Sequence, residues 1–163
     1  MAEEKPFGTT EADYSGRPFG FVMPDSETAM ICEKDSSVQE KIAGALQKMG
    51  FLTVQPVSDK EALRQMRLHI FNVFFIDEAF NAGGWESNRV LHYLKNLNMS
   101  IRRKSFIVLL SATLTTMDYM EAYNKSVNLI INKRDIDGVE KILRQAMAEH
   151  QDFYRVFKEK IST

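Results

Sequence analysis

Two adjacent carboxylates close a short apolar stretch of this chain. The segment FNVFFIDEAF, residues 71–80, carries bulky and β-branched side chains up to Asp77 and Glu78. A short continuous apolar run of this kind predicts a strand buried on both faces, as in a parallel sheet. Ligands of open parallel sheets bind just beyond the carboxyl ends of the strands. Asp77 is therefore predicted to lie where binding or a reaction would occur. The alternative is that it caps the strand end and accepts a bond from a loop amide.

Other polar side chains follow the remaining apolar runs in the same way: Glu33, Lys34 and Asp35 after residues 28–32, Ser111 after 106–110, and Lys133 after 127–131. Carboxylate oxygens are the ligands that Mg²⁺ prefers. A hydroxyl and an ammonium group can donate hydrogen bonds to phosphoryl oxygens. Together these residue types predict a site that handles a phosphoryl group. Each residue also has a structural alternative, because the acids and the serine could cap helices and the lysine could neutralise a carboxylate.

Strands and helices are predicted to alternate five times along the chain. This alternation favours right-handed βαβ units and an α/β fold, a three-layer α/β/α sandwich. Five units of this size favour a five-stranded parallel sheet in the flavodoxin-like order 2-1-3-4-5, which places strands one, three, four and five side by side. The first strand–helix turn, EKDSS, contains no glycine. That argues against a dinucleotide-binding fingerprint and against a P-loop.

Helix starts are predicted from capping patterns. Ser36 or Ser37, with an acid or amide three residues later, is expected to start the first helix. Thr115 and Asp118 are expected to cap a short helix that carries three large apolar residues, namely Met117, Met120 and Tyr123.

Composition narrows the class of protein. The chain has 163 residues and a net charge of −1. Its overall electrostatic field therefore does not attract nucleic acid or a membrane surface. A single cysteine, Cys32, excludes an internal disulfide, and the three histidines lack metal-ligand spacing. No apolar segment approaches the ~20 residues of a membrane span. We expect a cytoplasmic protein whose partners are other proteins.

The chain divides into three parts. Residues 1–26 are rich in Gly, Pro, Ser, Thr and acids and are predicted to be a tail or linker, residues 27–148 the folded domain, and residues 149–163 an extension of the last helix. The tail carries aromatic residues that could dock onto the domain or a neighbour: Phe7, Tyr14, Phe19 and Phe21.

The last helix carries a heptad-like apolar seam of Leu143, Ala146, His150, Phe153 and Phe157. A helix over residues 138–160 would span roughly 34 Å, longer than one sheet edge needs. The seam therefore predicts a homodimer or partner contact. The alternative is a fold-back onto the domain's own surface.

Residues 27 to about 148 resemble the receiver domains of two-component response regulators, the chemotaxis-regulator-like family. The resemblance rests on the motifs MICEKDSSV, VFFIDE, IVLLSA and LIINKRDID. It implies that Asp77 is the phosphoacceptor, Glu33 the first acid of a metal-binding pair, Ser111 the switch hydroxyl and Lys133 the partner of the phosphoryl group and the acids. It also implies a bacterial phosphorelay protein that receives its phosphoryl group from a histidine kinase.

Two departures from the family pattern affect this expectation. Lys34 stands where the family has the second metal-binding acid, and Ile130 stands at the aromatic switch position. A cation at position 34 would weaken Mg²⁺ binding, and Asp35 could restore a ligand only if the turn shifts by one residue. We therefore expect Mg²⁺ to bind weakly or not at all.

The leading hypothesis is a receiver-like signal-transduction module that acts through protein–protein interaction and whose phosphorylation is impaired. The alternative is a working receiver phosphorylated on Asp77. In either case the only catalysis expected is self-catalysed phosphoryl transfer to that residue, so the chain is not expected to be an enzyme in the ordinary sense. A third hypothesis, a small hydrolase or flavin-binding protein on the same fold, lacks a nucleophile elbow and a phosphate-binding loop.

Overall fold

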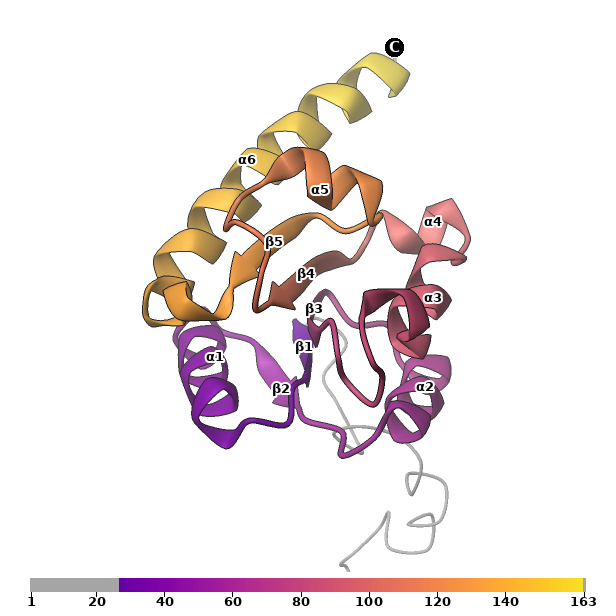
Figure 1. Cartoon of the computed structure of the whole chain (residues 1–163). Helices are drawn as coiled ribbons and strands as arrows, with labels where there is room; N and C mark the ends of the chain where they lie inside the picture. The colour runs from indigo at the N-terminus through magenta and orange to yellow at the C-terminus, as the bar shows by residue number, and fades with distance from the viewer. Residues whose placement is uncertain (1–26, 163) are drawn as a thin grey trace, which may run out of the picture.

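Five parallel strands form one sheet with the order β2-β1-β3-β4-β5 in the computed structural model. The structure describes the backbone of residues 27–162 and the side chains of residues 27–151. The predicted tail, residues 1–26, lies outside the described residues. The strands are β1 (Thr28–Cys32), β2 (Leu52–Val54), β3 (Val73–Asp77), β4 (Phe106–Ser111) and β5 (Leu129–Asn132). The fold class and strand order predicted from the sequence are confirmed (Figure 1).

Helices connect successive strands and cover both faces of the sheet. They are α1 (Ser36–Lys48), α2 (Asp59–Leu68), α3 (Arg89–Lys95), α4 (Met99–Arg102), α5 (Tyr119–Asn124) and α6 (Val139–Ser162), with 3-10 turns η3 (Trp85–Ser87) and η4 (Lys133–Gly138). Figure 1 shows α1 and α6 on one side of the sheet and α2 and α3 on the other. Within residues 27–162, none of the helices combines the length and the apolar character that crossing a bilayer requires.

The alternation of side chains along each strand produces two apolar cores. Ile31, Phe75 and Val108 belong to the core that α1 and α6 cover. Their sequence neighbours, such as Ile76 and Leu109, belong to the core beneath α2, α3 and α5. Because both faces are buried, the strands read as continuous apolar runs, which is why they were recognisable in the sequence.

Helix α1 begins at Ser36 as predicted, but its capping residue and the start of α5 differ from the prediction. Helix α1 is capped by Asp35, whose carboxylate accepts hydrogen bonds from Ser37 N at 2.9 Å and Val38 N at 3.4 Å. The predicted serine cap is therefore wrong by one or two residues. Helix α5 begins only after its cap Asp118, while Met117 precedes the helix with a φ of 65°. Met117 therefore takes a left-handed backbone conformation, which ends the preceding loop rather than starting the helix.

Helix α5 exposes its large apolar side chains. Met120 is 73 % exposed and Tyr123 is 81 % exposed, whereas Ala122 is the buried residue of this helix. Met117, which was predicted to belong to the helix, precedes it and packs against the core that α1 and α6 cover.

The first half of the seam on α6 packs onto the domain itself. Leu143 and Ala146 are buried in the core shared with α1, and the ring of His150 meets that of Phe106 edge-on with centroids 5.3 Å apart. The fold-back alternative is therefore confirmed for these three positions. The C-terminal turns of α6 extend past the sheet in Figure 1, as predicted. The side chains of Phe153 and Phe157 lie outside the described residues.

Candidate functional site

An ammonium group joins two carboxylates at the carboxyl edge of the sheet. Lys133 Nζ, at the start of the turn after β5, lies 2.9 Å from Asp77 Oδ1 and 3.1 Å from Glu33 Oε1. It also donates a hydrogen bond of 3.3 Å to Glu33 Oε2. Residues from the ends of β1, β3 and β5 thus converge as the parallel sheet predicts.

Burial differs strongly between the two carboxylates. The side chain of Glu33 is 2 % exposed, whereas that of Asp77 is 15 % exposed. Burial raises the pKa of Glu33 above its usual value. A hydrogen bond from Asp35 N, at 3.1 Å, and the contact with Lys133 oppose this shift, while the charge of Asp77 reinforces it.

The same contacts act on the lysine. Burial lowers the pKa of Lys133, but hydrogen bonds and charges from Asp77 and Glu33 outweigh it, so its pKa lies above the usual value. Lys133 therefore stays charged at neutral pH, and the cluster of two acids and one base carries a net charge of about −1 when both acids are ionised.

Ser111 takes part in a different set of contacts. Its hydroxyl donates a hydrogen bond of 3.0 Å to Glu78 Oε2 and accepts bonds from Thr113 N and Leu114 N. The same Glu78 oxygen accepts a bond of 3.3 Å from Ala112 N. Ser111 is fully buried, so its hydroxyl depends on these partners. The structure thus joins three predicted residues to one another, while Ser111 is bonded to a carboxylate that the sequence did not assign.

The sheet register explains why Glu78 meets Ser111. Asp77 pairs with Leu110 across β3 and β4, so the next residue on each strand falls opposite the other. The N–H of Glu78 donates to the carbonyl of Leu110 at 3.0 Å, which fixes the backbone just after Asp77. The adjacency of Asp77 and Glu78 was visible in the sequence, but the register was not.

The side chain of Asn88 also fixes the backbone at Asp77 and Glu78, and this role was not predicted from the sequence. This buried side chain donates to the carbonyls of Asp77 and Glu78, at 3.0 and 3.1 Å, and its own carbonyl accepts from Leu91 N at 3.0 Å to cap α3. An asparagine just before an apolar helical pattern is a capping signal, so its position in the sequence could have revealed half of this role.

The residues considered as further metal ligands do not join the cluster. Asp35 is exposed and caps α1. Lys34 is exposed, with its Nζ 5.9 Å from the centre of the Phe80 ring. Among the described side chains, no group of three or more His, Cys, Asp or Glu residues is placed to hold a metal ion.

Solved structures with this arrangement of strands and helices were found by structural comparison. A receiver domain (CheY-like) from Methylobacillus flagellatus aligns with a TM-score of 0.56 and 23 % identity over 75 % of this chain and 99 % of its own. A response regulator from Thermotoga maritima aligns with a TM-score of 0.57 and 17 % identity, over 76 % of this chain and 98 % of its own. The receiver domain of Francisella response regulator 1452 aligns with a TM-score of 0.56 and 17 % identity, over 76 % of this chain and 99 % of its own.

The chain has the receiver-domain fold. No family model matches the sequence, and no curated protein matches it either. Within the receiver fold, Ile130, at the position expected to be aromatic, is fully buried on β5, and its carbonyl accepts a hydrogen bond from Met117 N at 2.8 Å. Ile130 therefore helps to anchor the loop that follows Ser111.

Proposed function

We propose that this chain is a receiver-type signalling module that works through protein–protein interaction and whose phosphorylation on Asp77 is impaired. One observation carries the proposal: the carboxylate of Glu78 accepts hydrogen bonds from the Ser111 hydroxyl and the Ala112 N–H. A phosphoryl group on a neighbouring acid would need such donors for its own oxygens. Here an internal carboxylate already uses them, and its negative charge would repel the incoming group.

The contacts of Lys133 support the same proposal. Its ammonium group is bonded to both Glu33 and Asp77, which are the oxygen donors that a divalent ion would need. Lys34 adds a second cation at this edge, and the carboxylate of Asp35 is directed to the backbone of α1. These residues fit an internal ion pair better than Mg²⁺, so we propose that Mg²⁺ binds weakly or not at all.

The exposed face of α5 supports action through a protein partner. Tyr119, Met120 and Tyr123 are 48 %, 73 % and 81 % exposed on one short helix. Large apolar side chains gathered on a surface favour a protein contact. We propose a histidine kinase or another signalling protein as the partner, in the cytoplasm, with neither nucleic acid nor membrane involved. Homodimerisation through the last helix stays a prediction.

The alternative function, a working phosphoacceptor, has an observation of its own. Asp77 is partly exposed and held 2.9 Å from Lys133, so its free carboxylate oxygen could attack a phosphoryl donor. In that reaction a new O–P bond would form on Asp77, and the donor, for example acetyl phosphate, would lose its P–O bond and release acetate.

Intact-mass measurement after incubation with acetyl phosphate and Mg²⁺ separates the two functions. The proposed function predicts little or no added phosphoryl group in the full chain. Asp77→Asn is the matched control, because it removes the attacking oxygen and keeps the size of the side chain. A Mg²⁺-dependent gain of one phosphoryl group that disappears in Asp77→Asn would establish the working receiver instead.

A further inference from the structure

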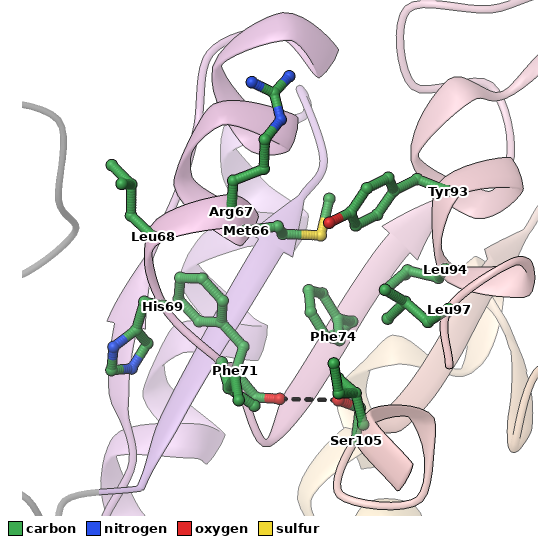
Figure 2. Close-up of a pocket in the computed structure, with 12 residues that line it drawn as sticks. Met66, Arg67, Leu68, His69, Phe71, Phe74, Tyr93, Leu94, Leu97 and Ser105 are labelled. Carbon is green, nitrogen blue, oxygen red and sulfur yellow. Dashed lines mark hydrogen bonds between the residues drawn. The ribbon is translucent and has the colours of Figure 1, made fainter. Parts of the chain in front are cut away.

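An apolar pocket of about 600 Å³ opens at the end of the sheet opposite to Asp77. Its walls come from the C-terminal part of α2 and from α3 with the segment that follows it, including Leu97, Ile101 and Ser105. Its floor comes from the amino end of β3 and the residues just before it. The side chains that shape it are Met66, Phe71, Phe74, Tyr93, Leu94 and Leu97 (Figure 2). The volume lies within the ~300–1,000 Å³ range of ligand-binding pockets.

The pocket exists because α3 is too short to cover the sheet. Helix α3 has seven residues and is therefore about 10 Å long. Beyond its end the rings of Phe71 and Phe74 form an apolar floor, which a hydrogen bond of 3.0 Å from Ser105 Oγ to the Phe71 carbonyl holds in place (Figure 2). At the rim, Leu68 and Ile70 are 46 % and 48 % exposed. The opening therefore presents apolar surface that an apolar segment could cover.

The start of the described chain lies at the edge of this pocket. Thr28 Oγ1 lies 3.1 Å from His69 Nε2 and donates a bond of 3.4 Å to the carbonyl of Ile70, and both of these residues line the pocket. Residues 1–26 precede this point. Phe21 is seven residues before Thr28 and Phe19 nine, so a chain of ~3.3 Å per residue lets either ring reach roughly 20 Å or more from Thr28. The pocket is thus within easy reach of the tail.

An apolar segment shortly before the domain has the composition that the pocket requires. The segment PFGFVMP, residues 18–24, contains four large apolar side chains and no charge. Phe19 and Phe21 are two residues apart, so an extended backbone over these residues would place both rings on the same side. Two aromatic side chains on one side could fill an apolar pocket, with ~150–250 Å² of surface available for burial on each.

We propose that residues 19–23 of this same chain dock in the pocket, with Phe19 and Phe21 against Phe74 and Leu97. The tail then covers the amino end of the sheet that α3 leaves open, and it forms part of the folded domain. The docked segment joins β1, α2 and α3 at the edge opposite to Asp77, so a partner that displaced it would expose the pocket.

Nuclear Overhauser spectroscopy of the full chain, with labelled methyl groups and Phe rings, tests this directly. We expect cross-peaks from the rings of Phe19 and Phe21 to the methyl groups of Met66 and Leu97. The double variant Phe19→Ser/Phe21→Ser should lose them. The matched control, Phe7→Ser/Tyr14→Ser, removes two aromatic rings from the same tail and should keep them. None of these substitutions touches the described core, so all variants should remain folded.

Two further measurements identify the occupant. Mixing differently labelled copies should give no cross-peaks between molecules, and cross-peaks that appear only in the mixture would overturn the proposal in favour of a second copy. In hydrogen exchange, amides of residues 19–23 should exchange at least about tenfold more slowly than those of residues 1–12, and Leu97→Lys should remove the difference. Equal exchange in both parts of the tail, without cross-peaks, would also overturn the proposal.

Discussion

Removing the ammonium group from the strand-end cluster should destabilise the fold in a way that depends on pH. In Lys133→Met the carboxylate of Glu33, 2 % exposed, would lose its only counter-ion among its described contacts and remain beside Asp77. Losing one partner of a buried ion pair costs about 3–5 kcal/mol. Because the side chain of Lys133 is 29 % exposed, water screens part of the interaction. We therefore expect the free energy of unfolding to fall by about 2–3 kcal/mol near neutral pH.

The sign of the pH dependence follows from the raised pKa of Glu33. A carboxyl group whose pKa is higher in the folded than in the unfolded state favours folding at low pH, and this contribution is lost as pH rises through the folded-state pKa. Without Lys133, which lowers the pKa of Glu33, that pKa should rise further. The destabilisation should therefore be larger at neutral pH than at mildly acidic pH, because Glu33 takes up a proton as the pH falls.

Urea denaturation of wild type and variant at both pH values measures this difference. The matched control is Lys41→Met, which breaks an ion pair of 2.7 Å with Asp137 in which the side chains are 45 % and 84 % exposed. That exposed pair should contribute less than about 1 kcal/mol to the free energy of unfolding. Adding Glu33→Gln to Lys133→Met should recover most of the lost stability. The reasoning would be refuted if Lys133→Met cost no more than Lys41→Met, or if its cost grew as the pH fell.

Three further predictions concern the neighbouring contacts. Glu78→Ala should lower the free energy of unfolding by about 1–2 kcal/mol, because the buried Ser111 hydroxyl loses a charged acceptor, whereas Ala at the exposed Glu86 should change it by less than about 0.5 kcal/mol in thermal unfolding. Asn88→Ala should cost about 2–3 kcal/mol in the same experiment, since it removes three hydrogen bonds at a buried position; a loss comparable to that at Glu86 would contradict this role. Lys34→Asp should increase Mg²⁺ affinity at least about tenfold by calorimetric titration, and an unchanged affinity would show that position 34 does not control the ion.

The sheet could be predicted from the sequence because four of its five strands, all except the edge strand β2, are buried on both faces. Runs such as residues 106–110 stay apolar throughout, and helical spacing separates them, which leaves few topologies to consider. The convergence of Glu33, Asp77 and Lys133 followed from that topology alone, since all three residues lie at strand ends. A correct strand order therefore placed three of the candidate side chains without any knowledge of their contacts.

Other parts of the site depend on details that a single sequence does not carry. The bond from Ser111 to Glu78 requires the register between β3 and β4, and a shift of one residue would have turned Glu78 toward the other face of the sheet. The prediction that Met117 belongs to a helix was wrong because its left-handed backbone delays the start of α5 to Tyr119. Local backbone conformations of this kind depend on tertiary contacts, here the bond from Met117 N to the carbonyl of Ile130.

The central claim is that two side chains, Glu78 and Lys34, keep Asp77 from being phosphorylated. The most direct test compares the rate at which acetyl phosphate modifies wild type and the double variant Lys34→Asp/Glu78→Ala, in Mg²⁺, by intact mass. The account predicts that the double variant gains a phosphoryl group at least about tenfold faster, since two freed donors and a restored acid each stabilise the transferring group. Equal rates in the two proteins, whether fast or slow, would contradict it.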